Sequence, residues 1–199
     1  IGGNGAGKST FFKCLTGQLK PTHGDVIIRD INTTYEETSH ISSLGIGIKT
    51  QVPNLFNSLN TEDHLWLAAR RHHDENQTVR RVKQIIERLG LGSIRFHKVG
   101  NLAHGQRQMV ELGMVISSDP WLVLLDEPAA GMTEDETYKT AQLIKEINET
   151  CSIIVVEHDM NFIREISKKV TLFHQGSILM EDTMENISAN PEAREVYLG

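Results

Sequence analysis

Apolar residues along the chain follow two patterns, short continuous runs and the 3.6-residue period of helices. The short runs predict strands at residues 24–30 (GDVIIRD), 44–51 (LGIGIKTQ), 121–126 (WLVLLD) and 151–159 (CSIIVVEHD), the last two of them buried. The helical period covers residues 8–17, 61–73, 78–90 and 133–149. Because the two patterns alternate, the sequence predicts an α/β protein whose parallel sheet is covered by helices.

Local signals place the ends and the buried faces of these elements. Thr133 and Glu136 have the spacing of a capping box, and Gln175 with Gly176 predicts a hairpin turn, with a short helix after the hairpin. The side chains expected to face a core are Phe11, Phe12 and Leu15 in the first helix and Val79, Val82, Ile86 and Leu89 in residues 78–90.

The chain opens with a glycine-rich loop, IGGNGAGKST. Gly2, Gly7, Lys8 and Ser9 have the spacing G-x-x-x-x-G-K-[ST], which is that of a phosphate-binding loop. Glycines let the backbone curl with its N–H groups pointing inward, and the following helix adds the positive end of its dipole. Lys8 is therefore predicted to contact the β- and γ-phosphates of a nucleotide, and Ser9 to offer its hydroxyl to Mg²⁺.

Two carboxylates follow the predicted strand at residues 121–126. Asp126 and Glu127 would emerge at the carboxyl end of that strand, the edge of a parallel sheet where ligands bind. Asp126 is predicted to hold Mg²⁺ through its water shell, and Glu127 to polarise the attacking water during hydrolysis of a γ-phosphate. His158 follows the next predicted strand and could reach the same phosphate.

Composition excludes several other classes of protein. No apolar run approaches the roughly 20 residues that a membrane span needs, so the chain is not itself a channel. The net charge of −6 argues against a protein that binds nucleic acid mainly through phosphate neutralisation. Cys14 and Cys151 lie far apart without a C-x-x-C pattern, which favours reduced thiols.

The combination of motifs resembles the ATP-binding-cassette (ABC) ATPases over the whole chain. The motifs are GGNGAGKST, Gln51, LAHGQ, LVLLDEP and VVEHD. The stretches HGQRQMVELGMVI, DEPAAGMTEDET, VTLFHQGSIL and VYLG are similar to the ATPase subunits of urea and branched-chain amino acid importers, the urea branch most of all. The resemblance implies a P-loop NTPase fold: a RecA-like catalytic core at residues 1–51 and 119–199, and an inserted helical subdomain at residues 52–118 that carries the signature motif.

The resemblance also implies a role for each motif. Gln51 would sense Mg²⁺ and the transport subunit, Glu127 would be the general base, and His158 would be the switch histidine. The signature would face the γ-phosphate of ATP that is held on a second subunit. The residues assigned to ATP are Gly2, Gly3, Asn4, Gly5, Ala6, Gly7, Lys8, Ser9, Thr10, Gln51, Ala103, His104, Gly105 and Gln106, and those assigned to Mg²⁺ are Ser9, Gln51 and Asp126.

The partners implied by the resemblance are those of an importer. They are a second ABC ATPase subunit in a homodimer or, preferentially, a heterodimer, transmembrane permease subunits, and indirectly a periplasmic or extracellular substrate-binding protein, but no nucleic acid. The chain would lie peripherally at the cytoplasmic face of the cell membrane. Pro53, Phe56 and Trp66 would either line a groove for a permease helix or pack in the core.

Two departures from the family pattern stand out. The signature usually has a serine where this chain has Ala103, so a hydroxyl donor to the partner-bound phosphate is absent, although His104 could donate instead. The family also carries strands upstream of the phosphate loop and an aromatic residue that stacks on adenine. Ile1 is interpreted as the last residue of the strand that leads into the loop, and the chain as part of a longer polypeptide that here lacks the N-terminal β-strands.

Alternatives to an importer ATPase remain open at this point. One is a non-transport cassette ATPase of DNA repair or translation, although the chain has one cassette and no long coiled-coil insertion between Gln51 and Leu102. Another is a nucleotide-binding scaffold that closes around ATP without hydrolysis, an interpretation motivated by Ala103. Within transport, urea and branched-chain amino acids are both possible substrates.

Overall fold

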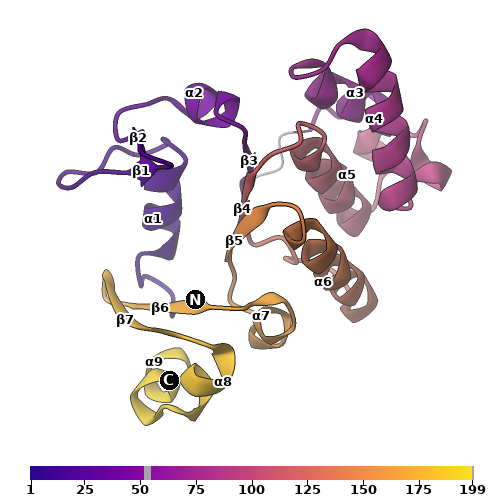
Figure 1. The fold of residues 1–199 in the computed structure, drawn as a ribbon. Coiled ribbons are helices and arrows are strands. Elements are labelled where there is room, and N and C mark those ends of the chain that lie inside the picture. The colour runs from indigo at the N-terminus through magenta and orange to yellow at the C-terminus, as the bar shows by residue number, and fades with distance from the viewer. Residues whose placement is uncertain (52–54, 199) are drawn as a thin grey trace. The chain divides into compact units, whose positions relative to one another are not determined.

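The structure is a computed structural model that describes residues 1–51 and 55–198, and these form two compact units (Figure 1). The terminal unit comprises Ile1–Leu44 and Val155–Gly199, and the central unit comprises Gly45–Ile154. Among the described residues no helix is long and apolar enough to cross a membrane.

The terminal unit combines short helices with two antiparallel strand pairs. Its elements are α1 (Lys8–Leu15), β1 (Ile27–Ile28), β2 (Ile31–Asn32), α2 (Thr38–Ser43), α7 (Met160–Ile166), β6 (Val170–His174), β7 (Ser177–Asp182), α8 (Met184–Ala189) and α9 (Pro191–Leu198). Its core contains Ile1, Ile163, Val170, Leu172, Met184, Ile187 and Ala193. The core therefore joins the start of the chain to elements near its end.

The predicted hairpin is confirmed as the pair β6 and β7. Gln175 (φ 47°) and Gly176 (φ 80°) are both left-handed, which is the geometry of a type I′ turn and matches the twist of the flanking strands.

The strand predicted at residues 24–30 is much shorter in the structure. Arg29 (φ 46°) and Asp30 (φ 63°) turn the chain at once, so Ile28 pairs with Ile31 across a second two-residue turn. Apolar pattern alone did not reveal this turn because neither turn residue is a glycine.

The central unit contains the parallel strands and the longer helices. Its elements are β3 (Ile46–Lys49), α3 (Thr61–Arg70), α4 (Glu75–Arg88), the 3₁₀ turns Gly92–Ile94 and Val99–Asn101, α5 (His104–Ile116), β4 (Leu122–Asp126) and α6 (Glu134–Asn148). β5 (Ser152–Val156) begins here and continues into the terminal unit. The strand order is β3-β4-β5, and β3 and β4 are parallel with Lys49 beside Leu125, so the predicted parallel sheet is confirmed.

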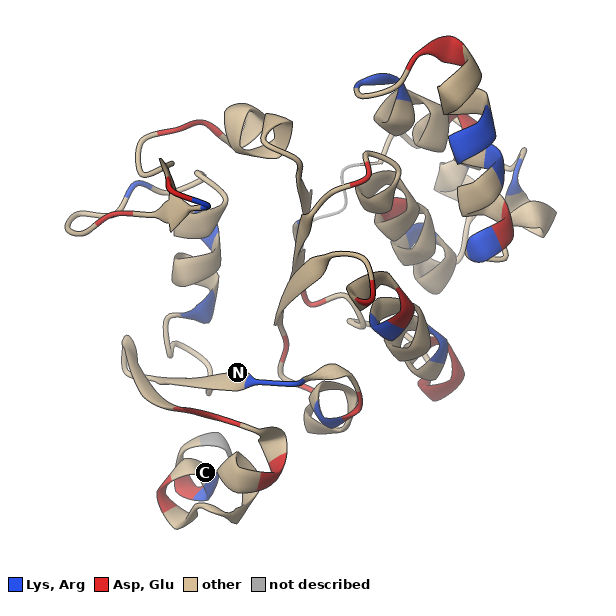
Figure 2. Ribbon diagram, in the orientation of Figure 1, with Lys and Arg blue, Asp and Glu red and all other residues tan. Residues whose placement is uncertain are grey.

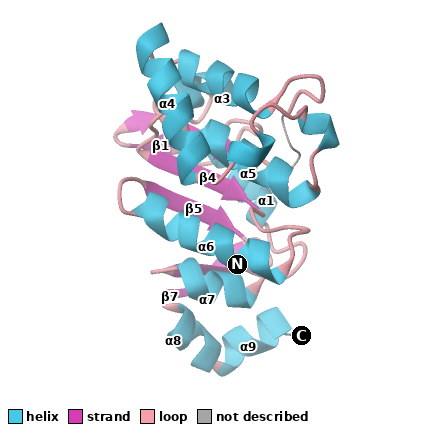
Figure 3. Cartoon of the chain, turned by 90° about the vertical axis from the view of Figure 1, so that its right-hand side faces the viewer, coloured by secondary structure: helices cyan, strands magenta, loops and turns pink. Residues whose placement is uncertain are grey.

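Helix α5 lies between the sheet and the two helices that precede it (Figure 3). On one side a Cβ added at Gly47 of β3 would meet Val115 Cγ1 at 2.7 Å. On the other side a Cβ added at Gly113 would meet Leu65 of α3 at 2.8 Å and Leu89 at 3.0 Å. Glycine at both contacts thus permits a close approach of backbone to side chain.

Three expectations about burial need correction. Phe11 and Val79 are 42% and 59% exposed, whereas Ile85 is buried in the face of α4 where Val79 was expected. The α4 face is rotated because α3 and α5 both pack on it, and this packing selects Val82, Ile85 and Ile86. β5 is not fully buried: it is the last strand in the order β3-β4-β5, and Ile154 is 40% exposed.

Charged residues are distributed unevenly over the helices of the central unit (Figure 2). Lys and Arg are concentrated on α4, and the first turn of α6 is acidic, with Glu134, Asp135 and Glu136. Acidic residues at a helix N-terminus are favoured by the helix dipole.

Both cysteines are free, as expected, and burial raises the pKa of the Cys151 thiol, which favours its protonated form.

Candidate nucleotide site

The glycine-rich loop has a left-handed backbone at its turns. Gly5 (φ 77°) and Gly7 (φ 102°) adopt conformations that other residues take only with strain, and Gly7 is the N-cap of α1. The loop therefore ends at a helix N-terminus, as the sequence predicts. Backbone N–H groups at such a terminus favour an anion.

Lys8 folds back over this loop. Its Nζ donates to the carbonyl oxygens of Gly2 at 2.7 Å and Gly3 at 3.0 Å. The ammonium group is thus held beside the turn where phosphates would bind, and the neighbouring side chains of Ser9 and Thr10 are exposed. An exposed serine hydroxyl in this position fits the preference of Mg²⁺ for oxygen ligands.

The start of the loop is tied to strand β6. Gly2 forms a parallel bridge with Phe173, and the Phe173 N–H donates to the Ile1 carbonyl at 2.9 Å. A Cβ added at Gly2 would lie 2.3 Å from the Phe173 carbonyl oxygen, so this position requires glycine. The pairing holds the first two residues of the chain beside β6.

At the carboxyl end of β4, the structure brings Gln51 and Glu127 together. Gln51 Nε2 donates to Glu127 Oε2 at 3.0 Å, although the two residues are 76 positions apart in sequence. Asp126 is buried at the last position of β4, and Glu127 follows with a left-handed backbone (φ 47°). Because non-glycine residues seldom adopt this conformation, the local strain marks Glu127 as a functional candidate.

The signature residues form the first turn of α5. Ala103 is the N-cap and supplies no side-chain hydrogen bond, while Gln106 Oε1 accepts from the Ala103 N–H at 3.0 Å. His104 Nε2 lies 2.9 Å from the Ala130 carbonyl oxygen, three residues after Glu127. The imidazole also contacts Gly131, where a Cβ would lie 3.1 Å from the ring.

The contacts of Nε2 indicate which nitrogen of the His104 ring carries a hydrogen. Nε2 must carry the proton, since it faces the Ala130 carbonyl, which only accepts. The Gln108 amide nitrogen lies 3.2 Å from the same His104 nitrogen. His104 Nε2–H is then engaged within its own chain, and Nδ1 in this tautomer has no hydrogen to donate, so the ring offers no further N–H to a partner-bound phosphate in place of a serine.

Gly105 lies directly against α6. A Cβ added at Gly105 would be 2.2 Å from Glu136 Oε1. The same glutamate completes the predicted capping box of α6, accepting from the Thr133 N–H at 2.9 Å. The signature turn and the start of α6 thus share one carboxylate.

Gly105→Ala is therefore expected to expel Glu136 from the capping box. Losing a cap costs about 1 kcal/mol, which corresponds to a lower Tm by about 2–4 °C in a protein of this size. Thermal unfolding of the Gly105→Ala, Glu136→Ala and double variants tests this. Once Glu136 is removed, Gly105→Ala should have little further effect, and full additivity of the two losses would contradict the shared contact.

His158 lies just beyond β5, at the N-terminal side of α7. Buried Glu157 accepts from the backbone N–H groups of His158 at 2.9 Å and Asp159 at 3.4 Å, and Asp159 caps α7. The His158 side chain is exposed. His158 and the phosphate loop belong to the terminal unit, whereas Gln51, Asp126, Glu127 and the signature belong to the central unit.

Of the three residues proposed for a permease groove, Pro53 lies outside the described residues. The other two are exposed, Phe56 more so than Trp66, although the Phe56 N–H donates to Nε2 of buried His64 at 2.9 Å. Exposure of both rings is compatible with a partner surface and argues against simple core packing of these two residues.

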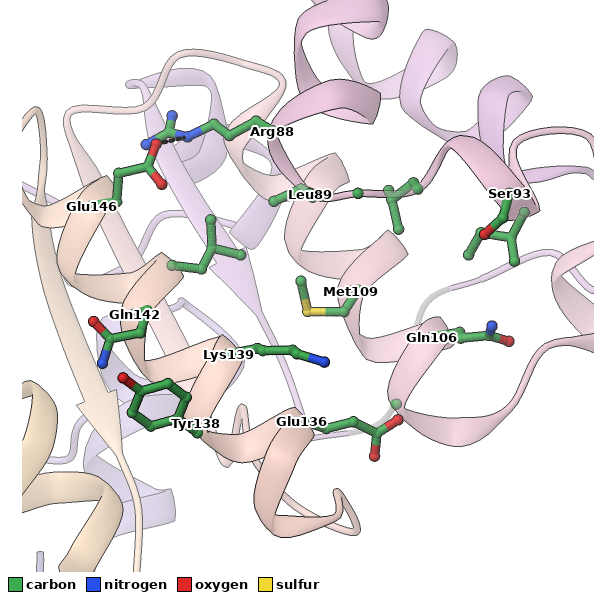
Figure 4. A pocket seen from close by; sticks show the side chains of 15 residues that line it. Arg88, Leu89, Ser93, Gln106, Met109, Glu136, Tyr138, Lys139, Gln142 and Glu146 are labelled. Atoms are coloured by element: carbon green, nitrogen blue, oxygen red, sulfur yellow. Dashed lines mark hydrogen bonds and ion pairs between the residues drawn. The ribbon is translucent and has the colours of Figure 1, made fainter.

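A cavity of about 580 Å³ lies beside the signature (Figure 4). Its walls come from the end of α4, the first turns of α5 and one face of α6, and an ion pair between Arg88 and Glu146 (2.7 Å) crosses from α4 to α6. Gln106 and Met109 of α5 reach the cavity wall. The signature turn thus has space on one side.

Two charged residues that no motif predicts are buried in the central unit. Lys49 ends strand β3, and Glu111 lies in α5 among apolar residues, with Nζ and Oε2 3.4 Å apart. The sequence does hold a signal for each, namely a lysine in an apolar strand and a glutamate between Val110 and Leu112.

Comparison with known proteins agrees with this geometry. A protein-family model described as "ABC transporter" matches residues 1–130. The high-affinity branched-chain amino acid transport ATP-binding protein LivG of Escherichia coli (strain K12) is 31% identical, over 100% of this chain and 85% of LivG.

Solved structures are similar in fold. MJ1267, an ATP-binding cassette of an ABC transporter, has a TM-score of 0.88 at 24% identity and covers 100% of this chain and 86% of its own. The cbiO1 protein from Clostridium perfringens, part of the ABC transporter complex cbiONQ, has a TM-score of 0.82 at 27% identity, over 100% of this chain and 81% of its own. The P-loop NTPase fold predicted for the chain is therefore confirmed.

Proposed function

The chain is an ATPase domain of the ABC transporter family, and from this premise we propose that it powers the uptake of a small solute through a membrane permease. The observation that carries the proposal is the contact between Gln51 and Glu127 at the end of β4. It joins the residue assigned to the transport subunit with the residue assigned to water activation, so a movement of the permease can reach the hydrolysis step.

Each residue of the site has a part in this mechanism. The loop N–H groups and Lys8 bind the phosphates of ATP, and Glu127 accepts the proton of the attacking water. Gln51 holds one oxygen of Glu127 and so orients the carboxylate. Ser9, Gln51 and, through the water shell, Asp126 would hold Mg²⁺, which would neutralise charge on the phosphates.

The signature completes the site in a second cassette. We propose that Ala103, His104, Gly105 and Gln106 present the N-terminus of α5 to the γ-phosphate held by a partner subunit, with His158 reaching the phosphate on its own subunit. The position of these residues in the first turn of a 13-residue helix supports this, because such a terminus attracts anions. The division into a core at residues 1–51 and 119–199 and a helical subdomain at residues 52–118 is part of the same proposal.

The proposed solute is a branched-chain amino acid or urea. The first is supported by the similarity to LivG, and the second by the sequence around His104. The proposed partners are a second ATPase subunit, preferentially a different one, the permease, and indirectly a substrate-binding protein. We propose that the chain lies at the cytoplasmic face of the membrane as a peripheral subunit.

Uptake by the reconstituted transporter tests this function. In vesicles that contain the full-length protein with its permease and binding protein, labelled leucine or labelled urea should accumulate only when ATP is supplied. Accumulation should be lost with Gln51→Ala, because the contact with Glu127 is removed. Exclusion of both labels, or co-purification of the protein with nucleic acid instead of a permease, would contradict the importer assignment.

One other function has an observation in its favour. Ala103 lacks the usual hydroxyl, and His104 Nε2 is engaged by Ala130, so the signature offers fewer side-chain donors to a phosphate. This would suit a cassette that binds ATP without hydrolysing it. A phosphate-release assay on the full-length protein with its partners distinguishes the two functions.

A further inference from the structure

A buried ion pair lies close to the proposed hydrolysis site without belonging to it. The side chains of Lys49 and Glu111 are only 1% and 6% exposed, and Nζ and Oε2 are 3.4 Å apart. Within the described residues Lys49 Nζ has no hydrogen-bond partner, so its interaction with Glu111 is one of charge.

The neighbouring contacts show how α5 lies on β3. Glu111 meets Lys49, and Val115, four residues later on α5, meets Gly47, two residues earlier on β3. Four residues of helix rise about 6 Å and two residues of strand about 6.6 Å, so the spacing of the two contacts along α5 matches their spacing along β3. The helix therefore runs antiparallel to the strand.

This direction places the two functional ends at one side. The N-terminus of α5 carries the signature, and the carboxyl end of β3 leads within two residues to Gln51. Gln51 in turn contacts Glu127, and His104 contacts Ala130 of the segment that follows Glu127. The signature helix is thus linked to both residues of the water site.

Stability alone does not account for a buried ion pair at this contact. Removing two charges from water is costly, and replacing such a pair with apolar residues of similar volume is often neutral or stabilising. The hydrophobic effect is non-directional, whereas a buried charge that moves away from its partner loses an interaction that nothing apolar replaces.

We propose that Lys49 and Glu111 are positioning residues that fix the axial register of α5 on β3, and thereby hold the signature in step with Gln51 and Glu127. The proposal rests on the proposed function, because it concerns the ATP hydrolysis of that function. The pair acts through Gln51 and does not touch the nucleotide.

The apolar double variant Lys49→Met with Glu111→Leu tests this in the full-length protein with its transport partners. We expect the melting temperature to stay within a few degrees. Affinity for ATP should change less than about threefold, while kcat falls about 10- to 100-fold, since small displacements of reacting groups have effects of this size. Unchanged kcat in the folded double variant would overturn the proposal.

A cycle with Gln51→Ala identifies the route. If the pair acts through Gln51, adding the apolar double substitution to Gln51→Ala should lower kcat less than about twofold further. If instead the fold-losses of kcat in the two separate variants multiply in the combined variant, the pair does not act through Gln51. Should the double variant fail to fold, Lys49→Leu with Glu111→Met replaces the same pair with other apolar side chains, and the same two comparisons apply to it.

Two controls separate the possible failures. Arg88→Met with Glu146→Leu removes a different ion pair of the central unit, between the end of α4 and α6, and should leave kcat unchanged. Glu127→Gln gives the background without hydrolysis. If ATP turnover of the unsubstituted protein does not exceed that background, both the proposed function and the inference fail. If the unsubstituted protein hydrolyses ATP and the apolar double variant does so at the same rate, only the inference is overturned.

Discussion

Glu127→Gln is expected to lower ATP turnover by about 10²–10⁴-fold while ATP binding remains, because only the general base is lost. The structure explains why binding should survive. Glutamine has the same shape as glutamate, and its amide oxygen can still accept from Gln51 Nε2, which now lies 3.0 Å from Glu127 Oε2. The left-handed backbone at this position is left as it is, since neither residue is branched at Cβ.

Phosphate release and equilibrium nucleotide binding, measured on the same preparation, test this prediction. Glu87→Gln is a matched control, because Glu87 is an exposed glutamate on α4 and its replacement makes the same change of charge far along the chain from the site. The control should retain full turnover. Turnover near the unsubstituted level in the Glu127→Gln variant would remove Glu127 from the role of base.

Lys8→Ala is expected to weaken ATP binding by at least about 100-fold. Charge-assisted hydrogen bonds contribute about 1.5–3 kcal/mol each, and Lys8 is assigned contacts to two phosphates. The ammonium donates to the carbonyl oxygens of Gly2 and Gly3, so contacts within the chain hold it over the loop. Little conformational entropy then remains to be lost when the nucleotide binds.

Isothermal titration with ATP and Mg²⁺ measures this loss, and thermal unfolding of the same variant checks that the loop still folds. Lys13→Ala is the control, because Lys13 lies in the last turn of the same helix and is exposed. Its affinity for ATP should equal that of the unsubstituted protein. Tight binding by Lys8→Ala would count against residues 2–10 as the phosphate-binding loop.

The Lys8→Ala and Glu127→Gln substitutions are expected to impair different steps. Lys8 is assigned to the ground-state complex with ATP, whereas Glu127 is assigned to the transition state of hydrolysis, so one variant should lose affinity and the other kcat. A similar separation applies to Lys49 and Glu111, which are expected to alter kcat with little change of affinity. Parallel measurement of both constants on all the variants therefore tests the assignment of roles as a set.

Features that depend on a few neighbouring residues could be predicted from the sequence. The glycine-rich loop before α1, the capping box of Thr133 and Glu136 and the turn at Gln175 and Gly176 all have the predicted form. Their physical causes are local, because a left-handed turn or a helix cap is satisfied within four or five residues. The family followed from the same local motifs in combination.

Tertiary packing decided which side of each element is buried and which distant residues meet. Periodicity placed Val79 on the buried face and did not single out Ile85, but the contacts of α4 with α3 and α5 bury Ile85 and leave Val79 exposed. The contacts of Gln51 with Glu127 and of Lys49 with Glu111 span 76 and 62 positions of sequence, and no local pattern encodes them. The sequence determines the chemical groups that each residue carries. Which residue each group contacts depends on how whole helices pack on the sheet.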